Sequence, residues 1–130
     1  MLYNPEQAAR VAYAAFRQLR EEQGGERGPV WHLLVSDEQA WFIRFVELVM
    51  AGERLFAIHD QWYEKLTAAG WREGPRIDHV KRTHPDLLPW RTLPEHVQRR
   101  LYVVQMITLG LYLEVPPGVS EVSGSSPVPA

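Results

Sequence analysis

The segment from residue 58 to residue 95 reads IHDQWYEKLTAAGWREGPRIDHVKRTHPDLLPWRTLPE, and its two halves follow different patterns. The first half repeats an apolar residue about every fourth position, which is typical of a helix, and the repeat stops at Gly70. Residues 71–91 have no sustained period and contain three prolines, which keep the residues before them out of the helical region. We therefore expect a helix followed by a long ordered loop with short β pieces, in which Gly70 and Gly74 mark positive φ angles or close backbone approach.

The residues on either side predict three further helices from apolar repeats and from start and stop signals. Residues 37–50 are apolar on nearly every side, so we expect their helix to be central. Capping-box spacing precedes three of the helices, in the pairs Asn4 with Gln7, Ser36 with Gln39, and Thr92 with Glu95. The four helices are expected at residues 5–23, at 37–50, at 53–69 and from about residue 93 onward.

The composition is that of one small globular domain. The chain has 130 residues, of which 45% are apolar and 23% are charged, enough for one core and too few for two. We expect a mainly α fold, a single compact domain over residues 1–113 with the long loop between its third and fourth helices. Residues 114–130 are rich in proline, glycine and serine, which predicts a flexible tail. The lack of cysteine excludes disulfides, thiolate nucleophiles and Cys-ligated zinc.

Charge is distributed unevenly along the chain. The formal net charge is −2, and the sum is −3 over residues 1–71, +3 over residues 72–100 and −2 over the remainder. The acidic total argues against binding to nucleic acid, and the short basic segment suits a small anion better than a duplex. We find no apolar run long enough to cross a bilayer and no secretion signal, and we therefore expect a cytoplasmic protein with no membrane partner.

About a dozen positions in correct order and spacing resemble the RyR repeat, a module named for the ryanodine receptors that also stands alone in bacterial and phage proteins. The matching positions are His59, Trp62, Lys65, Gly70-Trp71, Gly74, Asp78, Lys81, His84-Pro85, Pro89-Trp90 and Leu93-Pro94-Glu95. The repeat covers about residues 55–111. It departs from the family at Glu73, where an aromatic residue is usual, and at Leu101, where an acidic residue is usual.

The resemblance implies a non-catalytic binding module in a bacterium or an infected bacterial host. Paired repeats in the receptors hold an adenine nucleotide against the tryptophan of the helix motif, which corresponds to Trp62. Prokaryotic relatives have been proposed to recognise nucleotide-derived ligands in host–phage conflict. By this resemblance we expect an anionic, aromatic, nucleotide-like ligand, which a stand-alone protein of this kind would sequester, and no cofactor.

The expected ligand-binding residues are Trp62, His59, Lys81, Arg82, His84, Trp71 and Asp78. Trp62 would stack on the base, and His59 shares its helix face. Lys81 and Arg82 would hold the charged end, Arg82 through a guanidinium that grips two oxygens. Six of these residues also have a purely structural interpretation: Trp62 as a core anchor, His59 as a packing residue, the histidine at 84 and the tryptophan at 71 as loop anchors, and the basic pair as a solvated surface.

Other functions have weaker support in the sequence. Ser36 is the one serine before residue 120, and no base is placed to activate it, so we do not expect an enzyme. His79 and His84 lack a nameable third ligand, so we expect no metal site. The alternative that stays open is a protein-interaction module, in which a homodimer rebuilds the paired repeat and covers surplus apolar surface on residues 37–50.

Overall fold

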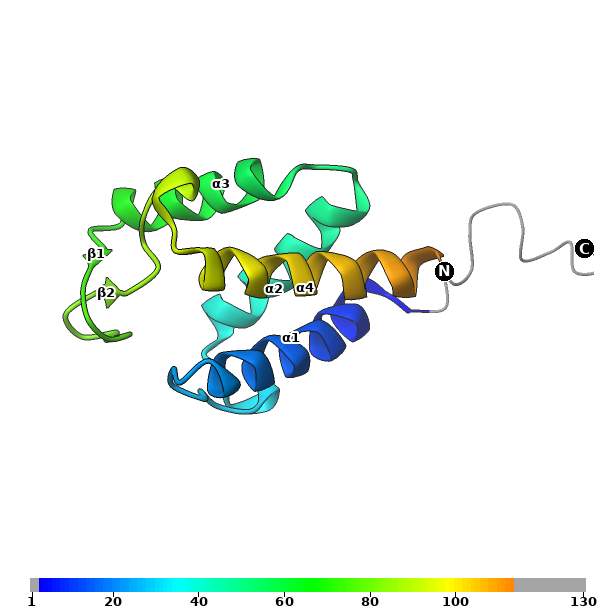
Figure 1. Ribbon diagram of the computed structural model, residues 1–130, viewed down its shortest axis with the longest axis horizontal. Coiled ribbons are helices and arrows are strands. Elements are labelled where there is room, and N and C mark those ends of the chain that lie inside the picture. Colours follow the sequence, from blue (N-terminus) through cyan, green and yellow to red (C-terminus); the bar gives the residue numbers. More distant parts are fainter. Residues whose placement is uncertain (1–2, 114–130) are drawn as a thin grey trace, which may run out of the picture.

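The computed structural model describes residues 3–113, which form four helices and two short strands (Figure 1). The helices are α1 (Pro5–Glu22), α2 (Ser36–Met50), α3 (Leu55–Ala68) and α4 (Glu95–Leu113), and the strands are β1 (Arg72–Glu73) and β2 (Thr83–His84). Single 3₁₀ turns, Trp31–Leu33 and Trp90–Thr92, precede α2 and α4. The predicted mainly α domain is confirmed. The predicted tail at residues 114–130 lies outside the described residues.

The core lies where α2 meets the other three helices. Its largest cluster combines Phe45, Leu48 and Val49 of α2 with Ile58 of α3 and Val104 of α4, each no more than 6% exposed. In Figure 1, α4 lies between α1 and α3, and it contacts both of them as well as α2. The apolar helix α2 also contacts the other three helices, as expected for a central helix, but it shares this position with α4.

One of the three predicted capping boxes forms. Asn4 Oδ1 accepts a hydrogen bond from the Gln7 amide at 2.8 Å, and Gln7 Oε1 accepts one from the Asn4 amide at 3.0 Å. Both bonds satisfy amides at the start of α1 that have no partner within the helix.

The capping boxes predicted at Ser36 and Thr92 are wrong. Ser36 is already the first residue of α2, because the extended residue before it, Val35, begins the helix without a side-chain cap. Gln39 donates instead to the backbone of the preceding 3₁₀ turn at 2.8 Å. The Thr92 hydroxyl donates to a carbonyl oxygen three residues earlier at 2.9 Å, and α4 begins only at Glu95.

The long loop is ordered by a small parallel pair of strands. The Arg72 amide donates to the Arg82 carbonyl oxygen at 3.0 Å, which starts the pairing of β1 with β2. Gly70 ends α3 with φ +91, and a Cβ at Gly74 would lie only 2.7 Å from Cβ of Thr83. The two glycines therefore have the roles predicted for them, one of conformation and one of close approach.

Candidate functional site

A cavity of about 630 Å³ lies at the end of the molecule where α3 ends and α4 begins. The loop with β1 and β2 forms one side of it, and the end of α1, the start of α2 and the link between them form the other (Figure 1). This volume falls within the usual range for small-molecule sites. Seven aromatic side chains other than histidine line it: Tyr13, Phe16, Trp41, Phe42, Phe45, Trp62 and Trp71.

Trp62 is partly buried on the cavity wall, and its ring contacts two imidazoles. The ring of His59, one turn earlier on α3, has its centroid 5.4 Å away. The ring of His84, at the end of β2, lies 4.9 Å away and nearly perpendicular, at 81°. Trp62 is thus fixed by its neighbours while part of it borders the cavity.

His59 is 5% exposed, and its Nε2 lies 2.6 Å from the Leu88 carbonyl oxygen. A carbonyl oxygen only accepts, so Nε2 carries a proton and donates. Burial lowers the pKa of His59, partly offset by this hydrogen bond and by the nearby carboxylates Asp60 and Asp86. The side chain therefore joins α3 to the loop, a longer-range contact than the local packing considered for it from the sequence.

His84 is also fixed as a neutral ring. Its Nδ1 accepts a hydrogen bond from the Asp86 amide at 3.0 Å, so in the neutral ring the proton is on Nε2. Burial lowers the pKa of His84 to about 4; the Asp86 carboxylate opposes this effect, and Arg20, His79 and His59 add to it. No hydrogen-bond partner for Nε2 occurs among residues 3–113, and the residue lines the cavity. His84 is therefore a neutral donor at the cavity wall.

Trp71 lines the cavity from the loop side. The ring of His79 meets it edge-on, with centroids 5.5 Å apart at 88°. His79 Nε2 in turn lies 3.3 Å from Oε2 of Glu38 on α2. These contacts fasten the loop across the mouth of the cavity to the start of α2.

The other three predicted residues do not line the cavity. Asp78 Oδ1 accepts from the amides of Val80 and Lys81, both at 2.9 Å, and these bonds help to lower the pKa of the carboxyl group. Lys81 is exposed on the same turn. Arg82 has φ +58 and donates from Nη1 to the Ala69 carbonyl oxygen at 2.7 Å, just beyond the end of α3. The structure therefore brings together Trp62, His59, His84 and Trp71 but not these three.

Arg20, a partly buried cation on α1 that lines the cavity, is not among the residues predicted from the sequence. Its guanidinium lies 4.9 Å from the centroid of the Phe16 ring, a cation–π distance. Within residues 3–113 it forms no ion pair. The spacing of Phe16 and Arg20 predicts their contact, but nothing local to α1 indicates that the loop lies across from them.

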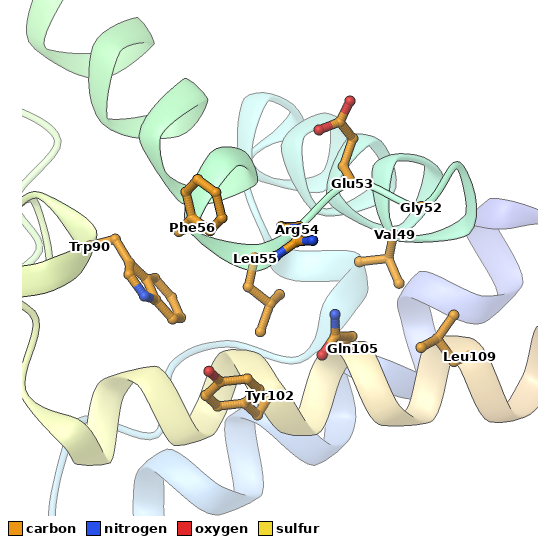
Figure 2. A pocket seen from close by; sticks show the side chains of 10 residues that line it. All are labelled: Val49, Gly52, Glu53, Arg54, Leu55, Phe56, Trp90, Tyr102, Gln105 and Leu109. Atoms are coloured by element: carbon orange, nitrogen blue, oxygen red, sulfur yellow. The ribbon is translucent and has the colours of Figure 1, made fainter.

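A second, more open groove of about 430 Å³ lies on another face, between the α2–α3 turn and α4 (Figure 2). Figure 2 shows Phe56, Trp90 and Tyr102 grouped around one part of it, while Glu53 points away. The Phe56 and Tyr102 side chains are each 48% exposed, so this face is apolar and uncovered within the described part of the chain.

Comparisons of the chain with protein-family models, with curated proteins and with solved structures give no match. The resemblance to the RyR repeat therefore rests on the motif residues alone and stays a hypothesis. Across residues 3–113, no three His, Asp or Glu side chains gather as metal ligands would. None of the helices in that range has the combined length and apolar character that a membrane crossing requires.

Proposed function

We propose that this protein is a non-catalytic binding module of the RyR-repeat type that holds a flat, nucleotide-like anion in the cavity beside Trp62. The observation that supports it most is the position of Trp62, which borders a 630 Å³ cavity instead of being enclosed in the core. Stacking of a base on an exposed aromatic face contributes about 1–3 kcal/mol. The other aromatic side chains of the wall would exclude water from the rest of the ligand.

The fixed histidines support binding in preference to catalysis. General acid–base chemistry at neutral pH requires a group with a pKa near 7 that is free to exchange a proton with the substrate. His59 donates to a backbone carbonyl, and His79 is paired with Glu38. His84 has a pKa of about 4 and so stays neutral. These side chains can position a ligand, and the proposal assigns them no proton transfer.

Isothermal titration against nucleotides and cyclic dinucleotides tests the proposal. We expect one compound of this class to bind the native protein and Trp62→Ala to weaken it at least roughly 10-fold, the loss expected for one stacked base. Trp90→Phe is the control, because Trp90 lies in the second groove and not on the cavity. Circular dichroism of each variant checks that it is folded. Equal affinity of the native protein and Trp62→Ala would refute the assignment of Trp62.

The proposed role is sequestration of a nucleotide-derived signal in the cytoplasm of a bacterium or an infected bacterial host. A sequestering protein must release its ligand unchanged. Chromatography of ligand recovered after heat denaturation of the complex therefore tests the role. Recovery of a chemically altered compound in more than stoichiometric amount would show turnover and contradict it.

A second candidate function is self-association through the α3–α4 face. Phe56 and Tyr102 border the second groove, and Met106, one turn beyond Tyr102 on α4, is 68% exposed. The surplus apolar surface lies here and not on α2, whose Arg44 and Glu47 face outward. Sedimentation velocity at micromolar concentrations separates the two states: a dimer that Met106→Lys dissociates supports this function, and a monomer at all concentrations excludes it.

A further inference from the structure

Two arginines converge at the edge of the cavity from the two ends of the described chain. A side chain built at Gly25 would meet Cγ of Arg20 at 3.0 Å and Nη2 of Arg100 at 3.6 Å, so the two arginines flank the same glycine. Burial lowers the pKa of Arg100; the Asp86 carboxylate opposes this effect, and repulsion from Arg20 adds to it. Arg100 is 6% exposed, and it remains charged at neutral pH like any arginine.

A single carboxylate, Asp86, pairs with one of these two cations. Asp86 Oδ2 lies 3.5 Å from Nη1 of Arg100, and the Nε of Arg100 donates to Gln23 Oε1 at 2.6 Å. Arg100 is therefore partnered on two sides. Among residues 3–113, the guanidinium of Arg20 forms neither an ion pair nor a hydrogen bond, so the cluster of Arg20, Arg100 and Asp86 carries a formal charge of about +1.

His84 extends this cluster toward Trp62. It lies close enough to Arg20 for that cation to influence its titration, and its ring contacts Trp62 at 4.9 Å. The N–H at Nε2 has no partner in the described part of the chain. A guanidinium and a neutral imidazole donor therefore line the same cavity, and each can donate to an oxygen of an anionic ligand.

Three further acidic side chains border the cavity. Glu38 Oε2 lies 3.3 Å from Nε2 of His79 on the loop. Glu26 and Asp37 are exposed at the solvent side, where water screens them. Lys65 also borders the cavity, but it is exposed on α3, so its ammonium is hydrated and less able to fix an anion than the partly buried Arg20.

We infer that Arg20, together with the Nε2–H of His84 in the same cavity, binds the anionic oxygen group of an aromatic ligand whose ring lies against Trp62. The inference rests on the proposed function and deepens it, because it moves the charged end of the ligand from the basic loop to α1. The chemical class is a planar aromatic body bearing a phosphate, carboxylate or sulfonate. Lys81 and Arg82 have no contact with the ligand in this arrangement.

Two fluorescent probes that differ by one anionic group test the inference. They are 8-anilino-1-naphthalenesulfonate and its neutral counterpart N-phenyl-1-naphthylamine, titrated into the full chain at physiological ionic strength. We expect Arg20→Gln to weaken sulfonate binding about 10-fold, the loss of one charge-assisted hydrogen bond, and to leave the neutral probe unchanged. Arg20→Lys should restore part of the loss. Arg27→Gln is the matched control, because Arg27 is exposed and pairs with Glu21 at 3.4 Å.

The outcomes separate this inference from the proposed function. If both probes bind and Arg20→Gln weakens them equally or not at all, the anion site is refuted and the cavity stands. A larger loss of sulfonate binding in Lys65→Gln than in Arg20→Gln also refutes it. If neither probe binds, the cavity does not accept aromatic ligands and both proposals fail. A second measurement uses the native protein and so does not depend on a variant folding. The ¹⁵N NMR signal of Arg20 Nε–Hε should shift when the sulfonate probe is added and stay unchanged when the neutral probe is added. A signal that does not move on addition of the sulfonate refutes the inference.

Discussion

Acidification from pH 7.5 to pH 5 should destabilise the fold through His84. The pKa of this ring is about 4 in the folded protein against 6.5 for the free side chain, because burial between Trp62 and the loop disfavours its charged form. Between these two values the unfolded chain binds a proton that the folded chain does not. The free energy of unfolding therefore rises with pH in this window and falls as the solution is acidified below about 6.5.

The magnitude follows from the same two values. A difference between 6.5 and about 4 corresponds to at most about 3 kcal/mol once the pH is below both. At pH 5 the folded ring is still mostly neutral while the unfolded one is almost fully protonated, which gives a loss of about 2 kcal/mol relative to pH 7.5. His59 has a lowered pKa as well and adds a loss of the same sign.

Urea unfolding at four pH values between 7.5 and 4.5 measures the effect, with His84→Asn as the matched variant. Asparagine keeps an acceptor oxygen near the position of Nδ1 for the Asp86 amide, which donates to His84 at 3.0 Å, but it does not titrate. His59 is unchanged in both proteins, so its contribution cancels in the comparison. We expect the native protein to lose about 2 kcal/mol more than the variant between pH 7.5 and pH 5. Parallel pH profiles for the two proteins would show that the ring titrates normally and would refute the reasoning.

Further predictions concern backbone approach and the buried ion pair. Gly74→Ala should lower the free energy of unfolding by about 1–3 kcal/mol, because its Cβ would lie 2.7 Å from Thr83. Gly110→Ala in α4, where a Cβ would meet no atom within 4 Å, should instead raise it by about 0.5–1 kcal/mol. Thermal unfolding of the two variants compares these effects, and equal effects would contradict the strand pairing. Asp86→Ala should cost about 3 kcal/mol by leaving the guanidinium of Arg100, whose side chain is 7% exposed, without its carboxylate. Arg100→Met added to Asp86→Ala should recover most of that loss in urea unfolding, and strictly additive losses would show that the two side chains act independently.

The helices could be predicted because their signals are local. Asn4 and Gln7 are three residues apart and satisfy each other, so the start of α1 follows from the sequence. Ser36 has the same pattern, yet the helix starts without it, because the carbonyl of Val35 already accepts from the amides of residues 38 and 39 at 3.0 and 3.1 Å. A capping pattern therefore predicts the approximate position of a helix start, whereas the conformation of the preceding backbone determines which residue is the first of the helix.

The cavity could be predicted only in part because its walls come from distant segments. The family motif indicated Trp62 and His84, and the pairing of β1 with β2 brings them together. The same basic loop predicted Lys81 and Arg82 as ligand-binding residues, but the Arg82 side chain donates to the backbone just beyond the end of α3 instead of lining the cavity. Arg20 belongs to α1, and its place beside the loop depends on the packing of α1 against α4, which no local pattern encodes.

The packing of α1 against α4 also has a consequence for the order in which the chain folds. Within residues 3–113, the first and last helices share the most extensive contact between elements, and the other described elements lie between them in sequence. During synthesis, α1 can pack first against α2, which follows it in the chain, but the part of its surface that α4 covers stays exposed until α4 has left the ribosome. The docking of α4 against α1 brings together segments that are far apart in the sequence. We therefore expect this small helical protein to fold more slowly than its helix content alone would indicate.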